Sequence, residues 1–142
     1  MKKVIRAKSP VRIGLGGGGT DVSPYCDEFG GVVLNVTINK YAYATLRLRE
    51  DLKVVFKSED MNLQESFENL SAVKIDGGKL DLLKSVAIRL GQNLPVGFEL
   101  TTCCNVPPRS GPGSSAAVFA VIIAVFYHLE KERRLSLYET AD

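Results

Sequence analysis

Val106-Pro-Pro-Arg-Ser-Gly-Pro-Gly-Ser-Ser-Ala-Ala117 leads directly into an apolar run over residues 118–127. A loop of glycine, proline and serine thus opens onto a helix that we expect over residues 114–131. The first N–H groups of a helix lack internal partners, and the helix dipole adds a partial positive charge at the same end. Gly111 and Gly113 carry no Cβ, so a phosphate can approach the main chain closely.

Two serines stand at the start of this helix. Ser114 and Ser115 can cap the helix, bind a phosphate oxygen or offer a hydroxyl to Mg²⁺. No lysine precedes the pair, so the Walker A pattern is excluded. The sequence of this loop alone leaves two alternatives, a phosphate-binding loop outside the P-loop scheme and a turn with an ordinary N-cap.

The composition is that of an ordinary globular protein. The chain has 142 residues, of which 45% are hydrophobic and 24% charged, and its net charge is +2. This length suits one domain, or one domain and part of another, with a sizeable core. The basic residues are scattered, which disfavours nucleic-acid binding. The N-terminal residues do not resemble a signal peptide, and the apolar run over residues 116–127 is too short to cross a bilayer.

The three cysteines are Cys26, Cys103 and Cys104, and they form no C-x-x-C pair and no set with metal-ligand spacing. An odd number of cysteines predicts a reduced, cytoplasmic protein. Cys103 and Cys104 fall at the end of an expected strand, where small buried side chains are common.

Expected strands outnumber helices and precede them, which predicts an α/β or α+β domain with a mixed or antiparallel sheet. The strands are expected at residues 4–7, 11–15, 32–39, 41–49, 53–57 and 96–102. A short helical turn is expected within residues 20–29, capped by Asp21 or Ser23. Helical spacing is shown by Leu80, Leu83, Ala87 and Leu90, and Gly91 ends that helix. Residues 58–78 are polar and predict no clear element.

A second glycine loop lies near the N-terminus, where Gly14-Leu-Gly-Gly-Gly-Gly19 matches G-x-G-x-x-G. The dinucleotide fingerprint also needs an acidic residue about twenty positions on, where Asn39 and Lys40 stand. The glycine loop of protein kinases fails too, because Asp21 occupies its valine position. We interpret the glycines as permissive backbone beside a ligand, with Arg12 able to neutralise phosphate and Asp21 able to bind a polyol. An exposed ion pair beside a flexible loop explains the same residues.

Taken together, the two loops resemble the motifs of one family. Pro10-Val-Arg-Ile-Gly-Leu-Gly-Gly-Gly-Gly-Thr-Asp21 resembles the first motif of the GHMP small-molecule kinases, and residues 107–117 resemble their second, phosphate-binding motif. Gly-Gly-Gly-Thr-Asp replaces the family's usual Gly-Glu-His-Thr-Asp, a variant similar to the branch of heptose 7-phosphate kinases and fucokinase-like enzymes. The resemblance implies a ribosomal-protein-like two-layer domain, with the sheet packed on helices, and phosphoryl transfer from ATP, with Mg²⁺, to a sugar hydroxyl.

The resemblance also implies roles for particular residues. Arg12 is the expected catalytic residue and offsets charge on the transferred phosphoryl group, while Asp21 binds sugar hydroxyls. The residues expected to line the sugar with Asp21 are Gly17, Gly18, Gly19, Thr20 and Tyr25. The residues expected to cradle the ATP phosphates are Pro107, Ser110, Gly111, Gly113, Ser114, Ser115 and Ala116, and Ser115 is also the expected Mg²⁺ ligand.

The chain departs from the family pattern in two ways. Pro112 stands where family members commonly have leucine, and proline fixes φ and removes one N–H. ATP affinity should fall if that N–H contacts phosphate in relatives; otherwise the loop is merely stiffer. The family's catalytic aspartate and C-terminal domain would lie beyond Asp142, after a helix predicted by the capping box Ser136-Leu-Tyr-Glu139. Residues 1–142 are therefore expected to be a truncated N-terminal ATP-binding domain with little turnover of its own.

For the intact enzyme, the resemblance implies D-glycero-D-manno-heptose 7-phosphate as substrate, phosphorylated on its anomeric hydroxyl, with fucose or another sugar as alternatives. A non-catalytic nucleotide- or sugar-binding module of the same fold is a further alternative, and the near-neutral charge disfavours RNA binding. No carboxylate is assigned as general base, and Glu99 and Asp81 are expected to be solvated. The expected partners are ATP and a small sugar, without nucleic acid or membrane, and a homodimer stays open.

Overall fold

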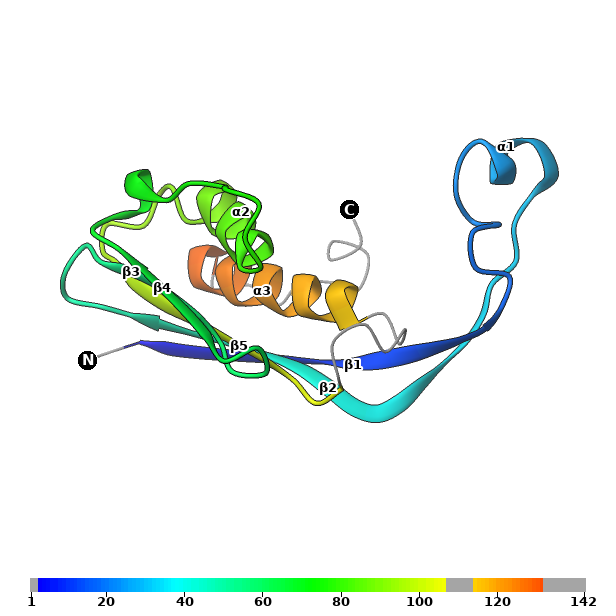
Figure 1. The fold of residues 1–142 in the computed structure, drawn as a ribbon, viewed down its shortest axis with the longest axis horizontal. Helices are drawn as coiled ribbons and strands as arrows, with labels where there is room; N and C mark the ends of the chain where they lie inside the picture. Colours follow the sequence, from blue (N-terminus) through cyan, green and yellow to red (C-terminus); the bar gives the residue numbers. More distant parts are fainter. Residues whose placement is uncertain (1–2, 107–113, 132–142) are drawn as a thin grey trace.

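The computed structural model describes residues 3–106 and 114–131. Along the chain, a long hairpin is followed by a short one, and then by two helices separated by a strand (Figure 1). The elements are β1 (Val4–Gly16), α1 (Tyr25–Phe29), β2 (Leu34–Leu48), β3 (Val54–Ser58), β4 (Leu63–Phe67), the 3₁₀ helix η1 (Leu70–Ala72), α2 (Asp81–Leu90), β5 (Phe98–Cys104) and α3 (Ser114–Lys131).

The five strands form one mixed sheet in the order β1-β2-β5-β3-β4. Neighbouring strands pair antiparallel, except that β3 and β5 run parallel. The helices α2 and α3 both lie on one face of this sheet (Figure 1). The predicted fold class, a mixed sheet packed on helices, is therefore confirmed.

The N-terminal hairpin corrects two strand predictions. Residues 4–7 and 11–15 belong to one strand, β1, and residues 32–39 and 41–49 similarly merge into β2. The pairing register shifts between Pro10 and Arg12, where three residues of β2 oppose a single residue of β1. β1 is an edge strand and has no neighbouring strand on its outer side. The N–H that Pro10 lacks therefore removes no interstrand hydrogen bond on that side.

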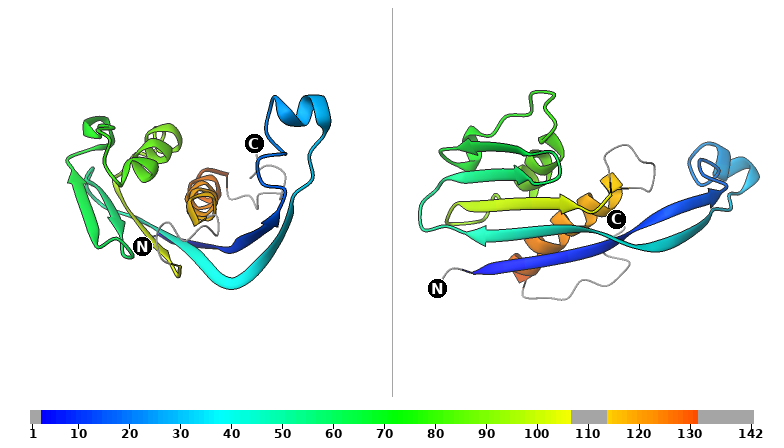
Figure 2. Two further views of the ribbon diagram at one scale, coloured as in Figure 1. Left: turned by 45° about the vertical axis from the view of Figure 1, so that its right-hand side comes forward. Right: turned by 60° about the horizontal axis from the view of Figure 1, so that its bottom comes forward.

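Beyond this irregularity the hairpin extends past the N-terminal end of α3, bends toward the face of the sheet on which the helices lie, and carries α1 at its tip (Figures 1 and 2). We call residues 12–37 the arm. The short helix predicted within residues 20–29 is confirmed, but its predicted cap is wrong, because Pro24 stands at the N-cap position and no side chain caps α1. The hydroxyl of Ser23 instead donates to Asp27 Oδ2 at 2.5 Å, and Asp21 turns back to the Gly19 N–H.

The core lies between the sheet and the two helices. Strands β3 and β5 and residues 41–46 of β2 alternate buried with partly buried side chains, as strands with one covered face do. A row of edge-to-face aromatic contacts joins Phe67, Phe56, Phe98 and Phe126, so that it runs from the sheet edge into α3. These contacts connect the β3–β4 hairpin with β5 and α3, which lie much later in the sequence.

The two main helices confirm their sequence predictions. Gly91 follows α2 as predicted, and its N–H donates to Ala87 O at 2.8 Å. Residues 58–78, which predicted no element, contain β4 and η1, where Asn69 caps the turn by accepting from the Ala72 N–H at 3.0 Å. Within the described ranges, we find no helix with the length and apolarity that crossing a membrane requires.

Candidate functional site

The glycine loop of the arm is closed by Thr20. Its hydroxyl lies 2.7 Å from Gly17 O and 3.2 Å from Val32 O, both of which can accept its proton. The same oxygen accepts the Val32 N–H at 3.1 Å, and the Thr20 N–H donates to Gly17 O at 3.0 Å. Thr20 thus ties the turn after β1 to the chain that leads into β2. Its predicted role in binding sugar stays a prediction, since these contacts lie within the loop.

Two glycines allow the strands of this loop to approach each other. Gly17 has a φ of +78°, and a Cβ there would stand 1.8 Å from Val32 O. At Gly31, a Cβ would stand 2.0 Å from Thr20 O. Any side chain at these positions would force the backbone apart, so both glycines are required by close packing of main chain on main chain.

The other predicted sugar residues are exposed around this loop. Asp21 accepts the Gly19 N–H at 3.2 Å on Oδ1, which orients the carboxylate and leaves Oδ2 open to a ligand. Tyr25 begins α1, is half exposed, and packs on Phe29 with ring centroids 5.2 Å apart. Arg12 lies in β1 opposite Thr37 and is exposed.

A second group of residues surrounds the N-terminal end of α3. A cavity of about 270 Å³ opens there. Its walls come from the β3–β4 turn, the start of α2 and the first turns of α3, over a floor at the end of β5. The lining residues are Ser58, Asp60, Met61, Lys79, Leu82, Leu83, Thr102, Cys104, Val106, Ser114, Ser115 and Val118.

This cavity has the electrostatics of an anion site. α3 has 18 residues and no acidic residue in its first turn, so its dipole is not offset there. Ser114 is half-buried, and Ser115 and Ala116 are exposed beside it. Across the cavity, Lys79 adds a positive charge, and Asp60 accepts a hydrogen bond from the Ser58 hydroxyl at 3.0 Å. Pro107, Ser110, Gly111, Pro112 and Gly113 lie outside the described residues, as does the helix predicted near Ser136.

The structure therefore divides the described candidate residues into two groups. Ser114 and Ser115 share a cavity with α2 and the β3–β4 turn, whereas Arg12, Asp21 and Tyr25 lie on the arm. The N-terminal end of α3 points to the side from which the arm projects, and Figures 1 and 2 agree on this. Both groups consequently lie toward the same end of the molecule.

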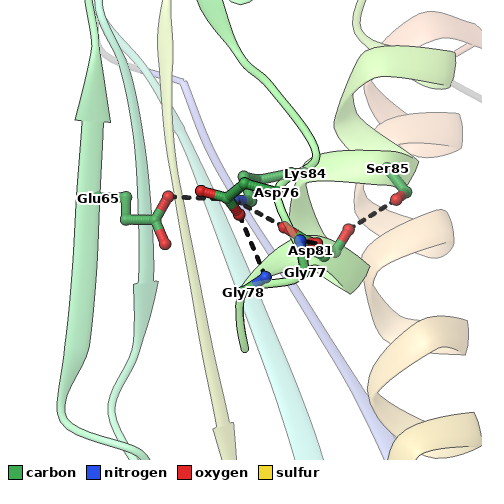
Figure 3. A network of polar contacts seen from close by, with 7 residues as sticks. All are labelled: Glu65, Asp76, Gly77, Gly78, Asp81, Lys84 and Ser85. Carbon is green, nitrogen blue, oxygen red and sulfur yellow. Dashed lines mark hydrogen bonds and ion pairs between the residues drawn. The ribbon is translucent and has the colours of Figure 1, made fainter.

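Sequence reasoning missed a buried lysine beside the cavity (Figure 3). Lys84 is fully buried, and its Nζ lies 2.7 Å from Asp81 Oδ1, 2.8 Å from Asp76 Oδ1 and 3.2 Å from Glu65 Oε2. The expectation that Asp81 is solvated was wrong, because its side chain is only 19% exposed. The available signal was a lysine within the apolar stripe of α2, three positions after an aspartate.

These contacts hold Lys84 and Asp81 in their charged forms. The carboxylates of Asp76 and Asp81 raise the pKa of Lys84 well above its ordinary value, more than burial lowers it. The Lys84 ammonium in turn lowers the pKa of Asp81, against the opposing effect of burial. At neutral pH, one cation therefore faces three carboxylates.

The cysteines have no reactive or ligating environment in the described part of the chain. All three are free thiols, Cys104 is buried, and burial raises the pKa of Cys103. In the same part, no three side chains among His, Cys, Asp and Glu are grouped to hold a metal ion. The role of the Ser115 hydroxyl as a Mg²⁺ ligand therefore stays a prediction.

Several known proteins with similar sequences or structures are kinases. The chain is 42% identical over 127 residues to D-glycero-alpha-D-manno-heptose 7-phosphate kinase of Campylobacter jejuni, covering 87% of this chain and 37% of that protein. The structure matches D-glycero-D-manno-heptose 1-phosphate kinase from Bacteroides thetaiotaomicron with a TM-score of 0.83 and 37% identity, over 98% of this chain and 45% of the other. Mevalonate kinase of Methanococcus jannaschii shares the fold, with a TM-score of 0.75, 18% identity, and coverage of 98% and 44%. No protein-family model matches the chain.

The fold and its sequence relatives define a small-molecule kinase domain. The chain belongs to the GHMP kinase superfamily, and its similarity to the heptose-phosphate kinases extends over most of its own length. It spans less than half the length of these relatives.

Proposed function

We propose that the chain is the ATP-binding domain of a sugar kinase, which transfers the γ-phosphoryl group of ATP to a hydroxyl of a sugar or sugar phosphate. The substrate that we propose first is D-glycero-D-manno-heptose 7-phosphate, with its anomeric hydroxyl as acceptor. The observation that carries this proposal is a cavity lined by Ser114 and Ser115 at the N-terminus of α3, whose first turn holds no acidic residue. The 42% identity to a heptose 7-phosphate kinase supports the choice of sugar.

The cavity offers each part of a nucleotide a chemically suitable surface. The first N–H groups of α3 and the Ser115 hydroxyl suit phosphate oxygens and, through them, Mg²⁺. Met61, Leu82 and Val118 present apolar surface to a base, and Asp60 can accept from ribose hydroxyls. Lys79 can pair with a phosphate from the opposite wall. Bound Mg²⁺ would supply charge neutralisation at the phosphates.

The arm carries groups that are suited to binding the sugar. Asp21 has an open carboxylate oxygen for a sugar hydroxyl, and Tyr25 offers a half-exposed ring beside it. The glycines of residues 17–19 let a ligand approach the main chain, and Thr20 keeps their loop in one conformation. Arg12, in the strand that leads into the loop, would offset charge that develops on the transferred phosphoryl group.

The test is a coupled assay of ADP release by the intact protein, with Mg·ATP and a panel containing D-glycero-D-manno-heptose 7-phosphate, fucose and galactose. We expect turnover with the heptose phosphate and a much lower kcat/KM with the other two sugars. Arg12→Ala should lower kcat about a hundred- to a thousand-fold, because it removes a preorganised charge from the transition state. The KM for ATP should change little, since Arg12 is not among the residues that line the cavity.

Calorimetry with Mg·ATP alone separates catalysis from simple binding. ATP binding without turnover on any sugar of the panel would contradict the kinase proposal and favour a nucleotide-binding module of the same fold. Turnover on fucose in preference to the heptose phosphate would support the kinase proposal and change its proposed substrate.

Two further predictions concern location and assembly. The free cysteines favour a cytoplasmic location, which fractionation can check, and light scattering can check for a homodimer.

A further inference from the structure

The contacts of Lys84 reach two walls of the cavity at α3. One wall is the start of α2, where Lys79, Leu82 and Leu83 line the cavity and flank Lys84 in sequence. The other wall is the β3–β4 turn, with Asp60 and Met61. Glu65 belongs to β4, directly after this turn, and Figure 3 shows it reaching from its strand toward the helix. Lys84 therefore connects the two walls through its ion pair with Glu65.

The loop that precedes α2 is wrapped around the same ammonium group. Asp76 Oδ1 pairs with Lys84 Nζ and also accepts the Gly78 N–H at 3.1 Å. The Gly77 N–H donates to Asp81 Oδ2 at 2.7 Å, while Asp81 Oδ1 faces Lys84. Figure 3 shows Asp76, Gly77 and Gly78 of this loop around the ion pairs, and Lys79 follows them directly in sequence, so its position depends on the conformation of the loop.

The positive charge of Lys84 is needed to hold the three surrounding carboxylates together. Three carboxylates point at one buried cation, so a neutral side chain at this position would leave three like charges facing each other. Removing the lysine is most unfavourable for Asp81, whose side chain is only 19% exposed, because a largely buried charge would lose its positive partner. The simplest relaxation is for β4 and the start of α2 to separate, which widens the cavity between them.

We propose that Lys84 is a positioning residue that sets the width of the nucleotide cavity and thereby its affinity for ATP. This inference rests on the proposed nucleotide site. Lys84 does not line the cavity, so it acts through Lys79, Leu82 and the β3–β4 turn. It contacts neither the arm nor the proposed sugar residues through any interaction that the described structure records.

Steady-state kinetics of the intact protein with Lys84→Met tests this role, because methionine has a similar length and no charge. We expect the KM for Mg·ATP to rise about tenfold, as small misplacements of binding groups do. The kcat and the KM for the sugar should stay within about twofold, as expected for residues without shared contacts. A lysine with a purely stabilising role would lower the amount of folded enzyme, and hence the apparent kcat, at an unchanged KM for ATP. That result would overturn the inference.

A second variant covers the case in which Lys84→Met does not fold. Asp76→Ala keeps the lysine and removes a carboxylate that is 65% exposed, so the fold should tolerate it. We expect its KM for ATP to rise about threefold, the equivalent of one lost hydrogen bond. An unchanged KM for ATP in this variant would also overturn the inference.

Arg49→Met is the matched control. It removes a cation that pairs with Asp51 at 2.6 Å, but at the Phe98 end of β5, whereas the cavity adjoins Cys104 at the other end. Its KM for ATP should equal that of the wild type. Calorimetry with ATP then separates the two proposals. Absence of ATP binding by the wild type would reject the proposed function and this inference together. Equal ATP binding by the wild type, Lys84→Met and Asp76→Ala would reject this inference alone.

Discussion

At the scale of single residues, the arm depends on a backbone contact that only glycine permits. Gly17 has a positive φ and lies against Val32 O, where a Cβ would stand at 1.8 Å. Left-handed backbone costs other residues about 1–2 kcal/mol before any clash is counted. Gly16, one position earlier, has open space around its Cβ position and an ordinary φ. The two positions form a matched pair for substitution.

We therefore expect Gly17→Ala to open the loop and Gly16→Ala to leave it closed. Amide hydrogen exchange should show faster exchange at the Thr20 and Val32 N–H groups in Gly17→Ala, because both donate within the closed loop. The KM for the sugar should rise in parallel. Equal protection in the two variants would contradict the close approach of the strands.

At the scale of elements, the aromatic row joins the sheet to the helices. Phe98 is 1% exposed and packs edge-to-face on Phe56 at 6.1 Å and on Phe126 of α3 at 5.4 Å. We expect Phe98→Ala to lower the free energy of unfolding by about 3–5 kcal/mol, because it leaves a cavity between β5 and α3. Urea titration followed by circular dichroism measures this change.

Phe29→Ala removes an equally large side chain from α1 and serves as the control. Phe29 is 71% exposed, so its loss should change the free energy of unfolding by less than about 0.5 kcal/mol. Comparable losses in the two variants would show that the row of rings does not join the sheet to α3.

The elements that were predictable from sequence have strong local periodicity. The apolar run of α3 and the spacing of Leu80, Leu83 and Ala87 in α2 fix these helices without tertiary information. β4 was missed because only Leu63, Glu65 and Phe67 alternate there, and one of these is charged. The interruption expected between residues 7 and 11 was wrong, because the edge position of β1 accommodates Pro10, and an edge position is a property of the assembled sheet.

The candidate site was predictable to a similar extent. Ser114 and Ser115 follow from local signals at a helix start, and the structure adds the cavity beside them. The surroundings of Lys84 were not predictable, since Glu65 lies 19 positions and Asp76 eight positions from it in sequence. Such a group forms only when β4 and α2 are brought together by the fold. Single-sequence reasoning therefore assigned Asp81 to solvent.

At the scale of the whole molecule, the two groups of candidate residues lie on different structural units. Ser115 belongs to a helix packed on the sheet, and Asp21 to an arm that leaves the sheet. In the proposed function, their ligands meet only where the γ-phosphoryl group reaches the sugar hydroxyl. Binding of the two substrates should therefore be energetically separable, while catalysis depends on both groups.

Single substitutions can test this separation in the intact protein. Ser115→Ala should raise the KM for Mg·ATP about tenfold, and Asp21→Asn should raise the KM for the sugar about tenfold, because each removes a hydrogen bond to a ligand. Each should leave the other KM within about twofold, and the double variant should combine the two effects additively, as distant sites do. A rise of both KM values in either single variant would instead indicate one continuous site, in which the arm folds over the mouth of the α3 cavity and contacts the nucleotide directly.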